Sequence, residues 1–258
     1  MKLLTATTFA TLLFSAATGA DEAQPRRDPK PSPDVLEVTP QLYRYTTEML
    51  FGEVWKREAL SPRDRSLITL AALVAGGQIP QLTGHIKLGL DNGLKPSEIT
   101  ALITHLAFYS GWPNAMSAAG VAKQVFSERN VPQDQITPTR TAPLTLDPES
   151  EAKRRAAVDA NLGEVAPELA RYTNDVLFGD LWRQTDLGPR DRSLITVAAL
   201  IAQGQPAQLP FHLNRAMDNG LSQAQAAEVV THLAFYAGWP RAMSAVPVLR
   251  EVVQGRAR

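Results

Sequence analysis

The sequence contains no cysteine, which excludes disulfide bonds, thiolate metal sites, cysteine nucleophiles and CxxC redox chemistry. It also lacks an excess of charge: 26 Lys and Arg balance 26 Asp and Glu. We therefore expect no nucleic-acid partner, because such partners require a basic surface. After the N-terminus no run approaches the apolar length of a membrane span, so we expect none. What remains is the composition of a 258-residue globular protein.

The first 20 residues predict a secretory signal peptide. Lys2 precedes an uncharged apolar run over residues 3–17, and small residues lead to Ala20. We expect cleavage near Ala20 and a periplasmic or secreted protein, with a buried or amphipathic first helix as the alternative. Residues 21–40 hold several prolines and predict an extended tether.

A tandem repeat organises the remainder of the chain. Residues 42–126 align with residues 169–253 without a gap, at a constant offset of 127, and about half of the aligned positions are identical. The sequence thus predicts one domain at residues 41–130 and a second at residues 166–255. Residues 131–165, which include four prolines and several threonines, are the expected linker.

Each repeat has the signals of an all-α domain, and no alternating strand pattern occurs. Ser61 before Pro62 is typical of a helix start, and Gly76-Gly77 of a helix end. A left-handed C-cap is expected at Asn92-Gly93. In the first repeat we expect helices at about residues 41–55, 62–75, 81–91, 96–109 and 114–128.

The four histidines form two pairs at equivalent positions of the repeats, His85 with His212 and His105 with His232. Histidine titrates near neutral pH and is the commonest general acid–base residue, although a buried structural histidine is an equal alternative. The helical stripes that contain His105 and His232 add further candidates. They are Glu98 and Tyr109 in the first repeat, and Glu228 and Tyr236 in the second.

Arginine and glutamine supply candidates for substrate binding. Arg65 and Arg192 could hold a carboxylate, or could pair with a neighbouring acid of the protein. Gln81 and Gln208 each precede a histidine by four residues and could orient its ring or bind a polar group. We predict no metal site, because the histidine spacing matches no metal-binding motif.

The sequence resembles the carboxymuconolactone decarboxylase family, which includes relatives of the alkylhydroperoxidase AhpD. The matching segments are PRDRSLIT, HIKLGLDNGL and ITHLAFYSGWPNAMSA, and all three recur in the second repeat. The resemblance implies two AhpD-like domains of about six helices each. It also implies assembly into a homo-oligomer, which for a tandem chain suggests a trimer.

The resemblance implies one of two chemistries. The peroxidase branch of the family needs two cysteines, and glutamine stands at both positions in each repeat, so thiol peroxidase activity is excluded. The decarboxylase branch needs no cofactor and acts on a small carboxylated lactone. Our hypothesis is such a lyase, with His105 or His232 as general acid–base, oriented by Glu98 or Glu228. His85 and His212 would line the same pocket. The alternative is an inactive exported binding or scaffold protein.

Overall fold

The computed structural model describes residues 31–137 and 141–256, and every regular element in these ranges is helical. The predicted signal peptide and the first part of the tether lie outside the described residues. No helix in the described ranges is long and apolar enough to cross a membrane. The all-α prediction with a tandem architecture is confirmed.

Within the two repeated segments the helices follow the same order, apart from one short 3-10 helix that is present only in the second. The first half contains α1 (Pro33–Val38), α2 (Pro40–Arg44), π-helical η1 (Tyr45–Phe51), 3-10-helical η2 (Val54–Lys56), α3 (Pro62–Ala75), α4 (Ile79–Asp91), α5 (Pro96–Ser110), α6 (Trp112–Glu128) and α7 (Gln133–Ile136). The second contains α8 (Pro148–Leu162), α9 (Pro167–Tyr172), η3 (Thr173–Phe178), η4 (Leu181–Arg183), α10 (Pro189–Gln203), η5 (Pro206–Gln208), α11 (Leu209–Asp218), α12 (Gln223–Ala237) and α13 (Trp239–Arg256).

Local signals set the ends of the central helices. The Ser61 hydroxyl accepts a hydrogen bond from the Asp64 N–H at 3.0 Å, and Pro62 occupies the first turn of α3. Helix α10 ends at Gly204, whose φ of 68° is left-handed and suits a residue without Cβ. Gly111, with φ 88°, turns the chain from α5 into α6.

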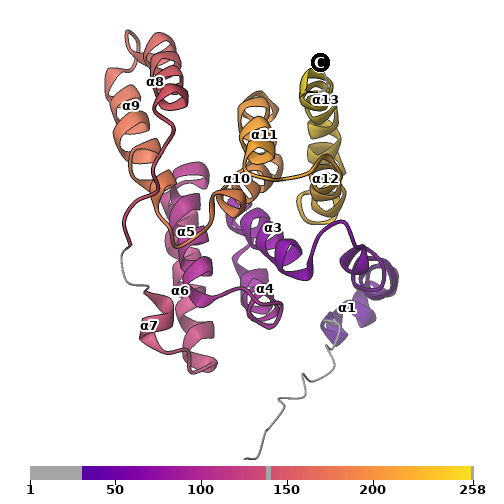
Figure 1. Ribbon diagram of the computed structural model, residues 1–258. Coiled ribbons are helices and arrows are strands. Elements are labelled where there is room, and N and C mark those ends of the chain that lie inside the picture. The colour runs from indigo at the N-terminus through magenta and orange to yellow at the C-terminus, as the bar shows by residue number, and fades with distance from the viewer. Residues whose placement is uncertain (1–30, 138–140, 257–258) are drawn as a thin grey trace, which may run out of the picture.

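The two repeats share one hydrophobic core. Helices α3 and α10 pack against each other at the centre of the molecule (Figure 1). Helix α5 of the first repeat packs on α10 of the second, and α12 of the second packs on α3. Because each central helix is contacted by a helix from the other repeat, side chains of both repeats meet along α3 and α10.

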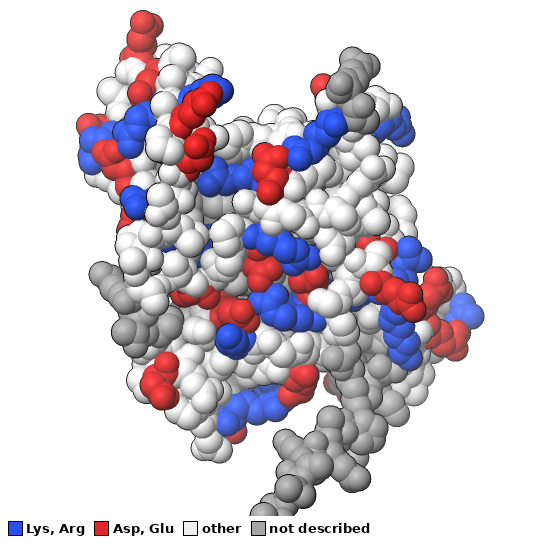
Figure 2. Space-filling model, viewed as in Figure 1, with Lys and Arg blue, Asp and Glu red and all other residues white. Residues whose placement is uncertain are grey.

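Two ion pairs join the beginnings of α3 and α10 in a reciprocal arrangement. The Arg63 guanidinium donates to Asp191 at 2.7 Å, and Arg190 donates to both oxygens of Asp64 at 2.9 and 3.0 Å. On the face shown in Figure 2, basic and acidic side chains alternate across the middle of the described chain. The PRDRS segments, which are identical in the two repeats, thus help to hold the repeats together.

The predicted tether and linker contain more structure than expected. Helix α1 lies within residues 21–40, and Ser32 caps it. Helix α8 spans 15 residues of the linker at 131–165, and Asp147 caps it. Arg154 on α8 is buried, because it stacks over Phe178 at 4.4 Å and donates to Asn174 at 2.9 Å. Proline content alone misses these helices, since proline at the first helical position favours a helix.

We predict that Asp64→Asn lowers the free energy of unfolding by about 1.5–3 kcal/mol, because the buried carboxylate binds Arg190 through two charged hydrogen bonds. The matched control is Arg129→Leu, which removes an exposed pair with Asp91 and should cost less than about 1 kcal/mol. Urea unfolding monitored by circular dichroism measures both changes. Equal losses in the two variants would contradict a special contribution of the junction.

Candidate functional site

Two clusters of histidine, tryptophan, tyrosine and arginine lie between the repeats. The first cluster contains Trp55, Arg65, Thr69 and His85 from the first repeat and Glu228, His232 and Tyr236 from the second. The second cluster contains Trp182, Arg192, Thr196 and His212 from the second repeat and His105 and Tyr109 from the first. Each cluster is therefore formed within one chain, by both repeats.

In the second cluster, both ring nitrogens of His105 are engaged by the protein. Nδ1 lies 3.4 Å from the Arg192 guanidinium, and Nε2 lies 2.8 Å from the Thr196 hydroxyl. Arginine can only donate, so Nδ1 accepts and Nε2 carries the hydrogen. The Thr196 hydroxyl gives its own hydrogen to the Arg192 carbonyl at 2.8 Å, which leaves its oxygen free to accept from His105.

The first cluster repeats this arrangement around His232. The Arg65 guanidinium donates to Nδ1 at 3.2 Å, and Nε2 lies 2.8 Å from the Thr69 hydroxyl. Both His232 and His105 have 0% exposed surface. These two rings are neutral, have fixed tautomers and have no nitrogen left for a ligand.

Burial decides the charge of these histidines. It lowers the pKa of His232 to about 3, with smaller contributions from the charges of Arg65 and His85. Burial, followed by the charge of Arg192, lowers the pKa of His105 well below its ordinary value. Sequence reasoning expects titration near neutrality, whereas the interior keeps both imidazoles neutral at pH 7.

His85 and His212 differ from the other pair because each has a nitrogen without a partner. Their Nδ1 atoms are buried and make no hydrogen bond with the described residues. Burial lowers the pKa of each to about 4. His85 lies between Trp55 and Tyr236, at ring distances of 6.2 and 5.4 Å. Each of these histidines therefore has a hydrogen-bonding atom that the described residues do not use, which calls for an explanation.

The tryptophans are site residues that sequence reasoning missed. Trp55 Nε1 donates to the Tyr236 hydroxyl at 2.9 Å, and Trp182 Nε1 donates to the Tyr109 hydroxyl at 2.9 Å. Burial raises the pKa of both tyrosines. The signal was present in the sequence, because FGEVW and FGDLW place a tryptophan at the same position of each repeat.

The two arginines predicted to hold a substrate carboxylate already bind carboxylates of the protein. Arg65 is fully buried and donates to Glu228 at 2.8 Å, and Arg57 donates to the same carboxylate at 2.9 Å. In the second cluster, Arg192 donates to Asp186. Glu228 therefore reaches His232 only through Arg65.

Glu98, Gln81 and Gln208 lie outside the two clusters. Glu98 accepts from Arg63 at 2.7 Å and from the Lys95 N–H at 2.8 Å, so it caps α5 and does not orient His105. Gln81 and Gln208 are exposed at the beginnings of α4 and α11. Within the described ranges, no group of three His, Asp or Glu side chains could hold a metal ion.

Comparison with known proteins agrees with this repeated architecture. The sequence model of the carboxymuconolactone decarboxylase family matches residues 40–124 and again residues 167–251. The chain belongs to this family.

Similar proteins include two that are named decarboxylases. The 4-carboxymuconolactone decarboxylase of Acinetobacter baylyi is 32% identical over 92 residues, which cover 36% of this chain and 69% of the relative. The nitrosuccinic acid decarboxylase of Metarhizium robertsii is 30% identical over 82 residues, or 32% of this chain and 57% of the relative. An uncharacterized 15.0 kDa protein of Paracoccus denitrificans is 28% identical over 96 residues, or 36% of this chain and 72% of the relative.

The two clusters differ in the position of the acidic residue that pairs with the buried arginine. Ala101 occupies the position that corresponds to Glu228, and Ala59 the position that corresponds to Asp186. The carboxylate that neutralises the buried arginine thus comes from helix α12 in the first cluster. In the second it comes from the loop before α10.

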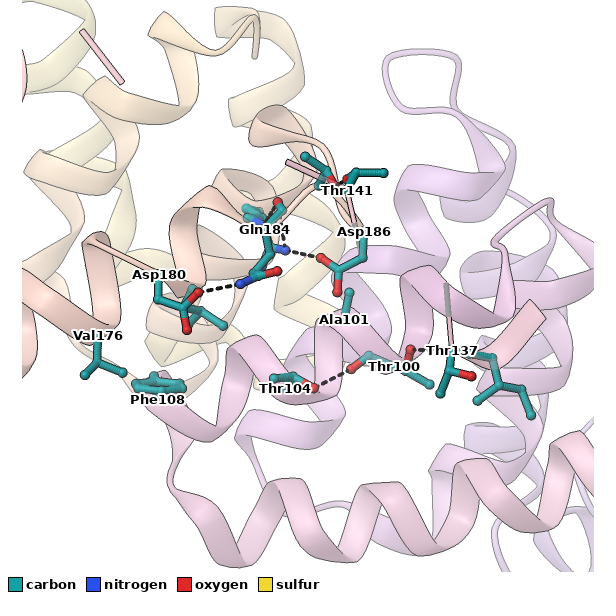
Figure 3. Close-up of a pocket in the computed structure, with 14 residues that line it drawn as sticks. Thr100, Ala101, Thr104, Phe108, Thr137, Thr141, Val176, Asp180, Gln184 and Asp186 are labelled. Atoms are coloured by element: carbon teal, nitrogen blue, oxygen red, sulfur yellow. Dashed lines mark hydrogen bonds and ion pairs between the residues drawn. The ribbon is translucent and has the colours of Figure 1, made fainter. Parts of the chain in front are cut away.

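The small Ala101 side chain lines a cavity of about 620 Å³ beside Arg192. Figure 3 shows Thr100, Thr104 and Phe108 of α5 along one side, with Gln184 and Asp186 across from them. Its lining charges are Asp180, Asp186 and Arg192. Asp186 neutralises Arg192, and Asp180 accepts from Gln184. This cavity therefore offers no uncompensated cation.

We predict that acid destabilises the protein between about pH 6.5 and pH 4. Unfolded histidine binds a proton below its ordinary pKa of 6.5, whereas folded His85 and His212 do so only near pH 4. The unfolded chain binds more protons in this window, so stability falls as the pH falls, by up to about 1.4 kcal/mol per pH unit per histidine. Urea unfolding at pH 7, 6 and 5 measures the slope, and His212→Asn should reduce it. Parallel curves for wild type and variant would contradict the assignment.

Proposed function

We propose that this protein is a carboxy-lyase that releases CO2 from a small carboxylic acid without a cofactor. Membership of the family and the two decarboxylase-named relatives support decarboxylase-like chemistry. The observation that carries the proposal is the buried, unpartnered Nδ1 of His85 and of His212. Each lies among aromatic rings in a cluster that also contains a buried arginine.

The names of the two relatives suggest the substrate class. Their substrates carry a carboxylate on a molecule that also holds a lactone or a nitro group. When the bond to CO2 breaks, its electron pair remains on carbon, and an electron-withdrawing group of this kind accepts it. One proton from water then replaces the CO2. We propose a carboxylated lactone or a similarly activated acid as the substrate of this chain.

The chain's own groups suit this reaction. A neutral imidazole donates a hydrogen bond from one nitrogen, and it can direct that bond at the oxygen on which negative charge develops. The rings of Trp182 and Tyr109 surround His212 and exclude water, which strengthens that interaction. We propose that His85 and His212 perform this role.

The sequence predicts general acid–base catalysis by His105 and His232. Since both nitrogens of each ring are already bonded within the protein, we propose that these residues position the cluster. Each links a buried arginine to a threonine of the same central helix. His105 and His232 would thereby hold the tyrosine and tryptophan rings in place.

We predict that His85→Asn combined with His212→Asn lowers kcat/KM by about 100-fold or more, the usual effect of removing a histidine that acts in the transition state. Turnover is followed as CO2 release and UV absorbance with 4-carboxymuconolactone and with nitrosuccinate as substrates. The single variants serve as mutual controls and show which cluster works. Circular dichroism confirms folding.

Unchanged kcat/KM in the folded double variant would refute the assignment of these two histidines. Absence of turnover by the wild-type protein on both substrates would instead favour the alternative function, an inactive binding or scaffold protein with this fold.

We also propose that the chain forms a homo-oligomer, a trimer of tandem chains. Large apolar side chains are exposed at equivalent positions of both repeats, namely Trp112 and Met116 on α6 and Trp239 and Met243 on α13. Light scattering after size-exclusion chromatography should give three times the chain mass. Trp112→Glu with Trp239→Glu should give the monomer, and a monomeric wild-type protein would contradict the proposal.

A further inference from the structure

One arginine of the second repeat is partly buried and stacks on two aromatic rings. The Arg215 guanidinium, on α11, makes no hydrogen bond or ion pair with the described residues, and its Nε is buried. It stacks over the ring of Trp182 at 4.3 Å and over that of Phe178 at 5.3 Å. Burial lowers the pKa of Arg215 below its ordinary value, but the group stays a cation at neutral pH. A partly buried guanidinium that makes no hydrogen bond to a carboxylate keeps donors that an anion from outside can use.

Arg215 faces a cavity of about 450 Å³ between α8 and α11, a size that suits a small molecule. The lining also contains the polar side chains of Ser150 and Asn214 and the ring of Phe211. Figure 1 shows α8 and α11 standing beside each other above the central helices. The cavity is therefore bounded by the α8 segment, which lies outside the repeated sequence.

The other cation of this lining, Arg154, is already paired, and the lining also contains the carboxylates of Asp147, Glu151 and Asp218. Glu151 binds Arg154, and Asp218 binds Arg256 at 2.8 Å. The Asp147 carboxylate caps α8 by accepting the Ser150 N–H at 2.8 Å. Arg215 is thus the cation of this lining that remains free to bind an anion.

Arg215 lies next to His212, the second unsatisfied group of this region. The two residues are three apart on α11, so they share a helical face, and both contact the ring of Trp182. The charge of Arg215 contributes to the low pKa of His212. In the first repeat the equivalent of Arg215 is Leu88. The His85 cluster therefore has no such cation.

We propose that Arg215 anchors the carboxylate of a small carboxylic acid in the cavity between α8 and α11, beside His212. This inference rests on the proposed function, because it takes the bound acid to be the substrate of the proposed lyase. It assigns the working site to the second cluster. The larger cavity of Figure 3 is a poorer carboxylate site, because Asp186 already neutralises its Arg192.

The test uses the full chain and succinate as the probe, with succinamide as the uncharged analogue. Isothermal titration calorimetry of the wild type should give one succinate per chain and no binding of succinamide. Arg215→Leu, which installs the residue of the first repeat, should weaken succinate binding at least tenfold. The affinity of Arg215→Lys for succinate should lie between those of the wild type and Arg215→Leu, because lysine keeps the charge and loses the forked geometry. The matched control is Arg155→Leu on α8. This change removes an equal charge from an exposed ion pair with Asp175, and the variant should bind succinate as the wild type does.

Two results would overturn the proposal: wild-type protein that does not bind succinate, or binding that is unchanged in folded Arg215→Leu. Circular dichroism and thermal unfolding check the fold of this variant, and Arg215→Lys provides the test if it does not fold. Turnover is measured separately on the same variants. Succinate binding that depends on Arg215, without turnover, would contradict the proposed lyase and support the Arg215 site. Turnover that is unchanged in the Arg215 variants would support the lyase and contradict the Arg215 site.

Discussion

The structure depends on two arginines buried at the junction of the repeats. Arg65 and Arg192 lie on the central helices and are 0% and 1% exposed. A buried guanidinium requires a carboxylate and acceptors for its remaining hydrogens. Glu228 and Asp186 supply the carboxylates, and His232 and His105 supply ring nitrogens. Since each histidine comes from a different repeat than its arginine, this requirement ties the repeats together and fixes both clusters.

The arginine requirement also explains how the two halves could diverge. The neutralising carboxylate can come from a helix or from a loop. It comes from α12 in the first cluster and from the loop before α10 in the second. Once Asp186 serves Arg192, position 101 no longer needs an acid, and alanine there lines a cavity. Glu228 keeps the same position filled in the first cluster. Identical core residues therefore support two different surroundings.

Neutrality is the second consequence of burial at the junction. All four histidines lie in an interior that disfavours the imidazolium, and the charges of nearby arginines disfavour it further at His105, His212 and His232. Two of the rings use both nitrogens to support the structure. The other two keep a buried nitrogen unsatisfied, at a cost that a purely structural residue would not require. The same residue type, duplicated in register, thus separates into a structural pair and a candidate functional pair.

Sequence alone determined the helical class, the tandem repeat and the ends of α3, α4 and α5, because caps and periodicity are local properties. It also selected the paired histidines and Arg65 and Arg192 as noteworthy. The sequence could not decide which residues each histidine contacts, because the register of one helix says nothing of its packing against a helix from the other repeat. Glu98 shares a stripe with His105, yet Arg63 and the cap of α5 take its carboxylate. Arg215 looks like an ordinary surface residue in sequence, and only the packing of α11 places its guanidinium over the Trp182 ring, with a buried Nε that makes no hydrogen bond with the described residues. Long-range contacts decide burial, and burial decides which of these groups remain free for chemistry.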